Sequence, residues 1–248
     1  MKANGNNTVT ALKIIKSVIF NTYFYVSVTF CLIFIFSPLT LFKSERPMRN
    51  AILSWINSVF FMLEHIVNIT IEERGTENIP RDKGIIYCSK HMSNIDALIL
   101  YRQSPDLIAL AKAELFRVPF LNLVFRKMNV LAIKRGAGEA HKQTPNNARV
   151  VAERKTPLII FPEGTRIKPY ERRPLKSGVY YFQCEEDLDV IVVAHNSGCF
   201  WPKGSLVKQP GRIIVHYYPP IAKNLPKDEF MQEVSSILIE QSERLFEV

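Results

Sequence analysis

A long run of residues without charge lies near the start of the chain. From Ser17 to Phe42 no residue is charged, and Ile, Phe, Val, Leu and Tyr dominate. About 20 apolar residues are enough to cross the core of a bilayer, so this run is long enough to enter a membrane. It is too long for a signal peptide, and no small-residue cleavage site follows it. The pattern predicts an N-terminal membrane-embedded helical segment.

The orientation of this segment is left open by its flanks. Basic residues lie on both sides of it, namely Lys13, Lys16, Lys43, Arg46 and Arg49. They give conflicting signals under the positive-inside rule. A helix pair that dips into one leaflet, with a break near Ser37-Pro38, is one arrangement that satisfies both signals. The next apolar stretch, Ala51 to Ile69, predicts an amphipathic helix in the interface or packed on the domain.

Short apolar runs alternate with helical patterns along the rest of the chain. The runs that predict strands are residues 84–88, 106–111, 129–133, 158–161, 190–194 and 212–217. The patterns that predict helices are residues 95–103, 140–153, 177–184 and 228–245. Such alternation indicates an α/β fold, in which helices flank a largely parallel sheet. We expect membrane-anchoring helices over residues 1–70 and an α/β domain over residues 71–248.

Composition narrows the set of partners. Among 248 residues the formal net charge is +9, which favours anionic partners such as a phospholipid surface, although plain solubility also explains it. No compact nucleic-acid motif is visible, so we expect no nucleic-acid partner. The four cysteines form no C-x-x-C pair and no two histidines are four residues apart. We therefore expect a reduced chain that faces the cytoplasm, with no metal site.

The first chemical motif directly follows a predicted strand. His91 and Asp96 stand five residues apart, where strand 84–88 has ended and helix 95–103 begins. A carboxylate on one imidazole nitrogen fixes the tautomer and leaves the other nitrogen free as a base. Ser93 or Asn94 is positioned to cap the helix. On its own this spacing also arises by chance.

The second motif, Phe161-Pro162-Glu163-Gly164-Thr165-Arg166, also follows a predicted strand. Gly164 permits a tight turn, and Arg166 offers a bidentate fork for a phosphate group. Glu163 can accept hydrogen bonds from a polyol or orient Arg166. A simple surface turn is the competing interpretation. The basic run 166–176 that follows is equally suited to solvent and to lipid head groups or an acidic acyl carrier.

In combination, these motifs resemble those of the glycerolipid acyltransferases of the 1-acylglycerol-3-phosphate type. Further matches to that family occur in the family's order, from about Ile71 to the C-terminus. They are residues 75–80 (GTENIP), 89–91 (SKH), 112–115 (KAEL), 133–135 (IKR), 176–178 (KSG) and 193–198 (VAHNSG). In the second block Lys134 stands where the family usually has Asp, and Met128-Asn129 stands where Gly is common. Because the family's second block lines the phosphate site, the resemblance says less about the exact substrate than about the reaction.

The resemblance implies a direct transfer of an acyl group. His91, held by Asp96, is expected to deprotonate the 2-hydroxyl of 1-acylglycerol 3-phosphate (lysophosphatidate). That oxygen would attack the thioester of acyl-carrier protein or acyl-CoA, without a cofactor. The residues expected to bind the acceptor are Lys112, Arg135, Glu163, Gly164, Thr165 and Arg166. No G-x-S-x-G elbow signals a serine acyl-enzyme.

Other functions remain open at this point. The acceptor could be glycerol 3-phosphate or another lysolipid, such as a lyso-ornithine lipid. The chain could also be a hydrolase that uses His91 to activate water, or a membrane-binding protein with an inactive fold. The expected location is a bacterial-type inner membrane, with the catalytic domain facing the cytoplasm.

Overall fold

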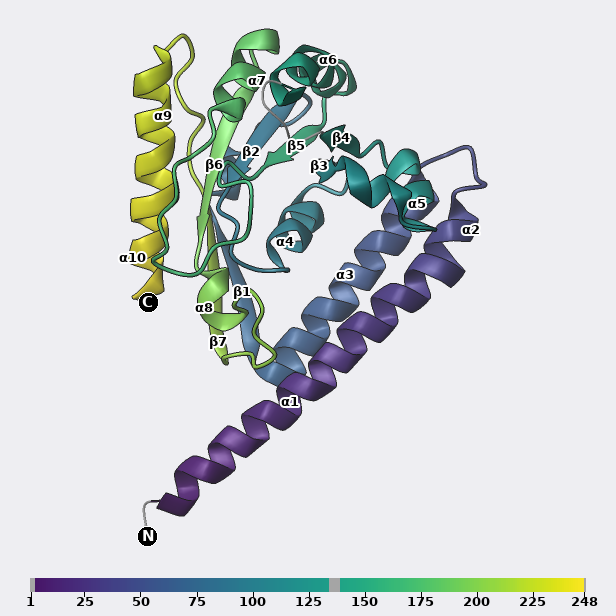
Figure 1. The fold of residues 1–248 in the computed structure, drawn as a ribbon, viewed down its shortest axis with the longest axis vertical. Coiled ribbons are helices and arrows are strands. Elements are labelled where there is room, and N and C mark those ends of the chain that lie inside the picture. The colour runs from purple at the N-terminus through teal and green to yellow at the C-terminus, as the bar shows by residue number, and fades with distance from the viewer. Residues whose placement is uncertain (1–2, 134–138, 248) are drawn as a thin grey trace.

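The computed structural model describes residues 3–133 and 139–247, with side chains described from Thr10 onward and not for residues 139–143. It consists of a seven-stranded sheet with helices on both faces, and a long helical hairpin along one side (Figure 1). The hairpin consists of α1 (Ala3–Phe30), a π-helical stretch Cys31–Phe36, α2 (Ser37–Leu39) and α3 (Arg46–Val67). The helical path ends next to Ser37-Pro38, where the sequence predicts a break.

The sheet has the order β1-β7-β6-β2-β5-β3-β4. Its strands are β1 (Ile69–Arg74), β2 (Ile85–Ser89), β3 (Ile108–Lys112), β4 (Leu131–Ile133), β5 (Pro157–Ile160), β6 (Asp189–His195) and β7 (Gly211–Tyr217). All neighbouring strands are parallel except the β6–β7 pair. The predicted fold class, a largely parallel sheet flanked by helices, is confirmed.

The remaining helices lie between the strands and after the last one. They are α4 (Asp96–Gln103), a 3-10 turn Ala113–Arg117, α5 (Leu121–Lys127), α6 (Glu139–Arg154), α7 (Gly178–Glu186), α8 (Ser197–Phe200), α9 (Lys227–Ser235) and α10 (Ser242–Phe246). A π-helical stretch, Ser236–Gln241, joins α9 to α10, so the helix predicted over 228–245 is not regular throughout. The sequence prediction also missed β1, because ITIEER at a sheet edge has charges and a weak apolar face.

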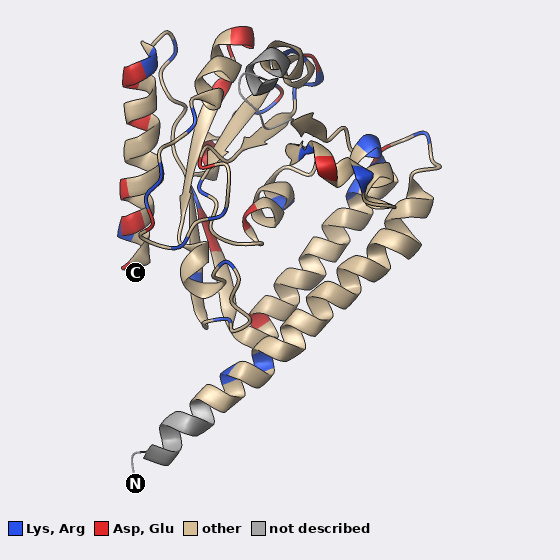
Figure 2. Ribbon diagram, in the orientation of Figure 1, with Lys and Arg blue, Asp and Glu red and all other residues tan. Residues whose placement is uncertain are grey.

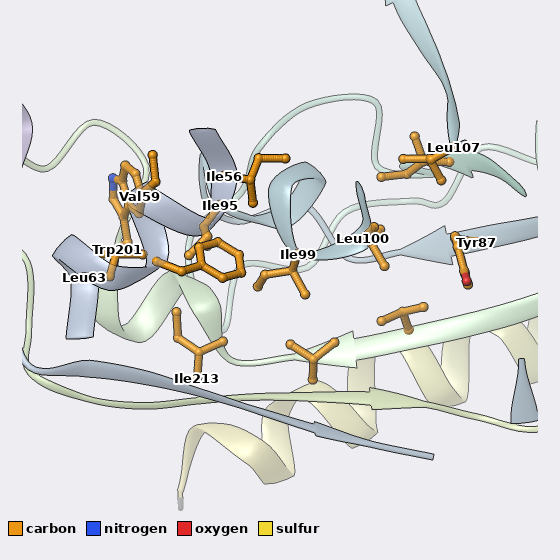
Figure 3. Close-up of a cluster of buried hydrophobic side chains, with 14 of the residues drawn as sticks. Ile56, Val59, Leu63, Tyr87, Ile95, Ile99, Leu100, Leu107, Trp201 and Ile213 are labelled. Carbon is orange, nitrogen blue, oxygen red and sulfur yellow. The ribbon is translucent and has the colours of Figure 1, made fainter. Parts of the chain in front are cut away.

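Alternate residues of the strands supply two separate cores. Ile85 and Tyr87 of β2 point to one face, where they pack with α3 and α4, as Figure 3 shows for the labelled side chains. Ile86 and Cys88 point to the opposite face, toward α6, α7 and α9. This period of two is the geometry of a pleated strand, and burial of both faces explains why β2 is apolar throughout.

The hairpin contributes one face to the first core and leaves the other exposed. Phe20 is fully buried, and its ring meets Trp201 edge-on at a centroid distance of 5.1 Å. Exposed apolar side chains cover the rest of the hairpin: Leu12, Ile14, Ile15, Val18, Ile19, Tyr25, Val26, Phe30, Phe34, Ile35, Leu41, Phe42 and Phe61. Between its two ends, the hairpin has almost no Lys, Arg, Asp or Glu (Figure 2). A patch of this size is typical of a membrane-contacting surface.

Polar contacts fix α1 to a loop of the domain. Asn21 donates a hydrogen bond to the Leu206 carbonyl at 2.7 Å, and its side-chain oxygen accepts one from Lys208 Nζ, also at 2.7 Å. Ser17 Oγ accepts the Lys208 backbone N–H at 2.9 Å. Burial lowers the pKa of Lys208 to about 8. Ser17 and Asn21, two polar residues within the apolar run, therefore face the domain.

Both long helices are apolar enough to cross a membrane by length and composition. The segments are Thr10–Leu39 and Arg46–Val67, and they contain 18-residue windows of mean hydropathy 2.0 and 1.3, respectively. Because α3 is amphipathic and part of it is buried in the domain, the hairpin is also an integral part of the fold. The division at residue 70 stays a prediction.

Two substitutions in α1 test this arrangement. Phe20→Ala should lower the free energy of unfolding by about 3–5 kcal/mol, because it removes a buried ring from the core. Phe30→Ala is the matched control: its ring is exposed, and the change should stay within about 0.5 kcal/mol in detergent micelles. Denaturant unfolding of the two detergent-solubilised variants measures both values. Equal losses of stability would contradict the packing of α1 on the domain.

Candidate active site

The site lies at the carboxyl end of the central strands. β2 is flanked by β6 and β5, and all three strands run parallel. The segments that follow β2 and β5 carry His91 and the 161–166 motif, respectively. In open α/β sheets this edge is where ligands bind. The topology therefore brings together two motifs separated by about seventy residues.

His91 and Asp96 form the pair that the sequence predicts. His91 Nδ1 lies 3.0 Å from Asp96 Oδ2, and the imidazole lines a cleft. With Nδ1 as the donor, Nε2 is the nitrogen left to act as a base, because no described residue hydrogen-bonds to it. The ring stacks on Phe161 at a centroid distance of 3.9 Å and an angle of 15°.

Asp96 is held by more partners than His91 alone. Its Oδ2 accepts the backbone N–H groups of Met92 and Ser93, each at 2.8 Å. Its Oδ1 accepts the hydroxyl of Ser197 at 2.6 Å. At the start of α4, Ser93 Oγ accepts the Ile95 backbone N–H at 3.4 Å, so one of the two predicted capping residues, Ser93, contacts the helix start. The Asp96 carboxylate at the first helical position binds the free N–H groups of Met92 and Ser93 as well.

The electrostatic environment keeps Asp96 ionised. Burial alone pushes the pKa of Asp96 upward, but the interaction with neighbouring His195 and the hydrogen bonds from His91 and Ser197 hold the pKa below its ordinary value. Burial lowers the pKa of His195, whose Nε2 donates to the Lys90 carbonyl at 2.8 Å. His195 therefore has a structural contact with the segment that precedes His91. An ionised Asp96 stabilises the imidazolium that forms when His91 takes up a proton.

The Glu163 side chain is directed at the backbone of His91 and not into the cleft. Its side chain is buried and does not line the cleft; its Oε2 accepts the His91 backbone N–H at 2.7 Å, and its Oε1 lies 3.5 Å from Lys90 Nζ. Burial raises the pKa of Glu163 to about 7 and lowers the pKa of Lys90. The structure thus places the Glu163 carboxyl group on the His91 backbone and Lys90, and the role of Glu163 toward the acceptor stays a prediction. Sequence alone could not show which way the side chain of the motif points.

A cleft of about 890 Å³ opens beside His91. Its apolar walls come from β3, β4, β5 and α7, and its polar walls from the 161–166 segment and α6. No Asp or Glu is among the described residues that line it. The lining side chains used below are His91, Lys112, Gly164, Thr165, Arg166 and Lys176. A cleft with long apolar walls and cations at one end fits an amphipathic anion.

Three cations face this cleft. The guanidinium of Arg166 and the ammonium of Lys176 have no hydrogen-bond or ion-pair partner among the described residues. Lys112 lies 3.5 Å from exposed Glu114. Arg135, the remaining predicted cation, falls outside the described residues. Lys176 was not assigned a role from sequence, although the K-x-G match pointed to its position.

Gly164 explains how Lys176 reaches this place. Its backbone has φ +69°, a conformation that favours glycine, and a Cβ there would lie 2.7 Å from Lys176 Nζ. Lys176 also donates its backbone N–H to the Pro162 carbonyl at 2.9 Å. The absence of a side chain at position 164 therefore lets the lysine lie across the loop.

Other charges nearby are already paired. Arg172 contacts Glu243 through two hydrogen bonds, at 2.9 and 2.6 Å, and Arg173 contacts Glu171 at 2.7 Å. Because these arginines are paired with glutamates, the 166–176 run carries less unpaired positive charge than its sequence indicates. Among the described residues no cluster of three or more His, Cys, Asp or Glu side chains could hold a metal ion.

Comparison with known sequences decides the family. The family described as Acyltransferase matches residues 70–196, which is half of the chain and contains both motifs. The chain belongs to the acyltransferase family. This acyltransferase is 30% identical over 183 residues to the 1-acyl-sn-glycerol-3-phosphate acyltransferase of Pseudomonas aeruginosa, with 73% of this chain and 70% of that protein aligned. The protein of the same name from Borreliella burgdorferi is 26% identical, over 71% of each chain.

The fold of this acyltransferase also has a solved counterpart. The crystal structure of the 1-acyl-sn-glycerophosphate acyltransferase from Thermotoga maritima superposes with a TM-score of 0.76. The match covers 94% of this chain and 97% of that chain, at 21% identity. The similarity of fold therefore includes the N-terminal hairpin.

Ser197 gives a test of the Asp96 environment. Ser197→Ala removes the hydrogen bond to Asp96 Oδ1 and leaves a buried carboxylate oxygen without its described donor. The free energy of unfolding should fall by about 1–3 kcal/mol, and acyl transfer should slow. Because the hydroxyl helps to keep the pKa of folded Asp96 low, the variant should lose less stability on acidification, and this loss should end at a higher pH than in the wild type, while its onset, set by the unfolded chain, stays the same. Unfolding curves at a series of pH values measure this, and superposable pH profiles for the two proteins would contradict it.

Proposed function

We propose that this enzyme transfers a fatty acyl group from a thioester, acyl-carrier protein or acyl-CoA, to the sn-2 hydroxyl of 1-acyl-sn-glycerol 3-phosphate, giving phosphatidate for phospholipid synthesis. The observation that carries the proposal is the cleft: the Asp96-held imidazole of His91 stands beside unpaired Arg166 and Lys176, with no acidic residue in the described lining. The names of the relatives from Pseudomonas aeruginosa and Borreliella burgdorferi support the same acceptor.

In the proposed reaction, one addition is followed by one elimination. Nε2 of His91 takes the proton of the acceptor hydroxyl as its oxygen bonds to the thioester carbonyl carbon. The carbon–sulfur bond then breaks, and the thiolate leaves with the proton that His91 held. Such a positioned base contributes about 10²–10⁴-fold to the rate. Direct transfer needs no cofactor and no covalent acyl-enzyme.

The phosphate of the acceptor would lie among the cations of the cleft. Arg166 can bind two phosphate oxygens through its planar fork, and Lys176 and Lys112 add positive charge. Thr165 can donate a hydroxyl, and the Gly164 backbone allows close approach. Arg135 completes the set that the resemblance implies. The apolar walls then suit the acyl chains.

The exposed face of the hairpin supports a membrane location. Apolar side chains cover it from Leu12 to Phe61, while its opposite face packs in the domain core. A lysolipid could therefore reach the cleft from the same leaflet. All four cysteines are free, which fits a cytoplasm-facing domain on a bacterial-type inner membrane. Soluble thioester donors would meet the enzyme on that side.

A transfer assay on detergent-solubilised protein tests the proposal. Labelled acyl-CoA and acyl-carrier protein are each offered with lysophosphatidate, glycerol 3-phosphate or a lyso-ornithine lipid. Transfer to lysophosphatidate is expected, and His91→Ala should lower kcat by about 10²–10⁴-fold without loss of fold. Acylation of one of the other acceptors alone would replace the proposed acceptor. Thiol release without any acceptor would indicate a hydrolase, and no reaction at all would indicate an inactive fold.

Arg166→Ala separates acceptor binding from chemistry in the same assay. Loss of a charge-assisted contact should raise the KM for lysophosphatidate by about 10- to 100-fold, because such a bond contributes about 1.5–3 kcal/mol. Arg172→Ala is the matched control, since that arginine is paired with Glu243 and lies outside the cleft lining. An unchanged KM in Arg166→Ala would remove the phosphate role of this residue.

A further inference from the structure

The 161–166 motif has two sides with different surroundings. Five of its six residues line the cleft, and Glu163 does not. The Glu163 side chain is about 1% exposed and is directed at the polypeptide around His91. A carboxylate in the cleft would also repel a phosphate group, whereas behind the cleft it meets Lys90. The residue of the motif with a negative charge is thus the one kept away from the proposed anion.

This segment holds His91 at three points. Glu163 Oε2 accepts the His91 backbone N–H at 2.7 Å, and the Ile167 backbone N–H donates to the His91 carbonyl at 2.8 Å. The Phe161 ring stacks on the imidazole at 3.9 Å. Both peptide groups of His91 and one face of its ring are therefore fixed by residues 161–167. Asp96 then needs only to fix the rotation of the ring through Nδ1.

Lys90 keeps the Glu163 carboxyl group in this place. Its ammonium is 3.5 Å from Glu163 Oε1, its side chain is about 2% exposed, and its carbonyl accepts a hydrogen bond from His195. Burial raises the pKa of Glu163 and lowers the pKa of Lys90, so each group is shifted toward its neutral form. Either form of Glu163 retains an oxygen that can accept the His91 N–H. The hold on His91 does not depend on the charge of the pair.

We infer that Glu163 is a positioning residue for the base: it fixes the backbone of His91, supported by Lys90, and does not bind the acceptor. This inference rests on the proposed function, in which His91 is the base and the acceptor phosphate lies at Arg166 and Lys176. A small displacement of a catalytic group lowers the rate steeply, by about 10²-fold for 1 Å. The loss of this contact should therefore appear in kcat and leave the acceptor KM unaltered.

Two double variants isolate the contact. Lys90→Met/Glu163→Gln and Lys90→Met/Glu163→Met both remove the buried charges and keep the side-chain volumes similar. They differ in one respect: glutamine supplies an oxygen for the His91 N–H, and methionine does not. We expect kcat of the methionine variant to be about 10- to 100-fold below that of the glutamine variant. The acceptor KM of both should stay within about 2-fold of the wild-type value, while thermal unfolding checks that each is folded.

The single variant Glu163→Gln, compared with Arg166→Ala, gives a second readout that retains the native shape. A positioning role predicts little change in the acceptor KM of Glu163→Gln, against a large rise in Arg166→Ala. A rise in the KM of Glu163→Gln similar to that of Arg166→Ala, or equal kcat values in the two double variants, would overturn the inference. The acceptor is whichever lysolipid the wild type acylates best, so failure with lysophosphatidate alone counts against the proposed function and not against this inference.

Discussion

The proposed chemistry depends on the fixed position of the His91 imidazole ring. His91 lies at the end of the central strand, and its surroundings come from segments far apart in the chain: Asp96 from α4, Glu163 from the loop after β5, and Ser197 from α8. Asp96, Glu163 and Ser197 are themselves buried, and each contact is a hydrogen bond, which makes it costly to lose. A parallel sheet is suited to this task, because it brings several strand ends to one edge and covers both of its faces with helices.

The sequence predicted the elements that have a strong local signal. Strand 84–88 is apolar at every position because both faces of β2 are buried, and the resemblance placed His91 opposite Asp96 across one bend. The sequence prediction missed β1, because the charged residues of this edge strand obscure the alternation of apolar and polar positions. It also could not show that the Glu163 side chain is directed at the His91 backbone, because residue type gives no side-chain direction. Ser197 contacts Asp96 from 101 positions away, and only the sheet register places it there.

The N-terminal hairpin joins two surfaces that are usually separate. Its inner residues, such as Phe20 and Leu63, belong to the same core as β2 and β6, while its outer residues are apolar and exposed. Polar Ser17 and Asn21, which interrupt the apolar run, lie on the side that meets the 205–210 loop. A membrane contact on such a hairpin would be transmitted to the sheet through packed side chains, and would fix the orientation of the cleft relative to the lipid.

The cationic end of the cleft has a consequence for turnover. Under the proposed reaction the phosphate group is not consumed, so Arg166 and Lys176 would meet the same charge before and after the chemical step. Interactions that are equal in both states lower KM without raising kcat, and they slow the departure of product. What changes is the number of acyl chains. The second chain increases the preference of the product for lipid, so partition into the leaflet would supply the driving force for its release.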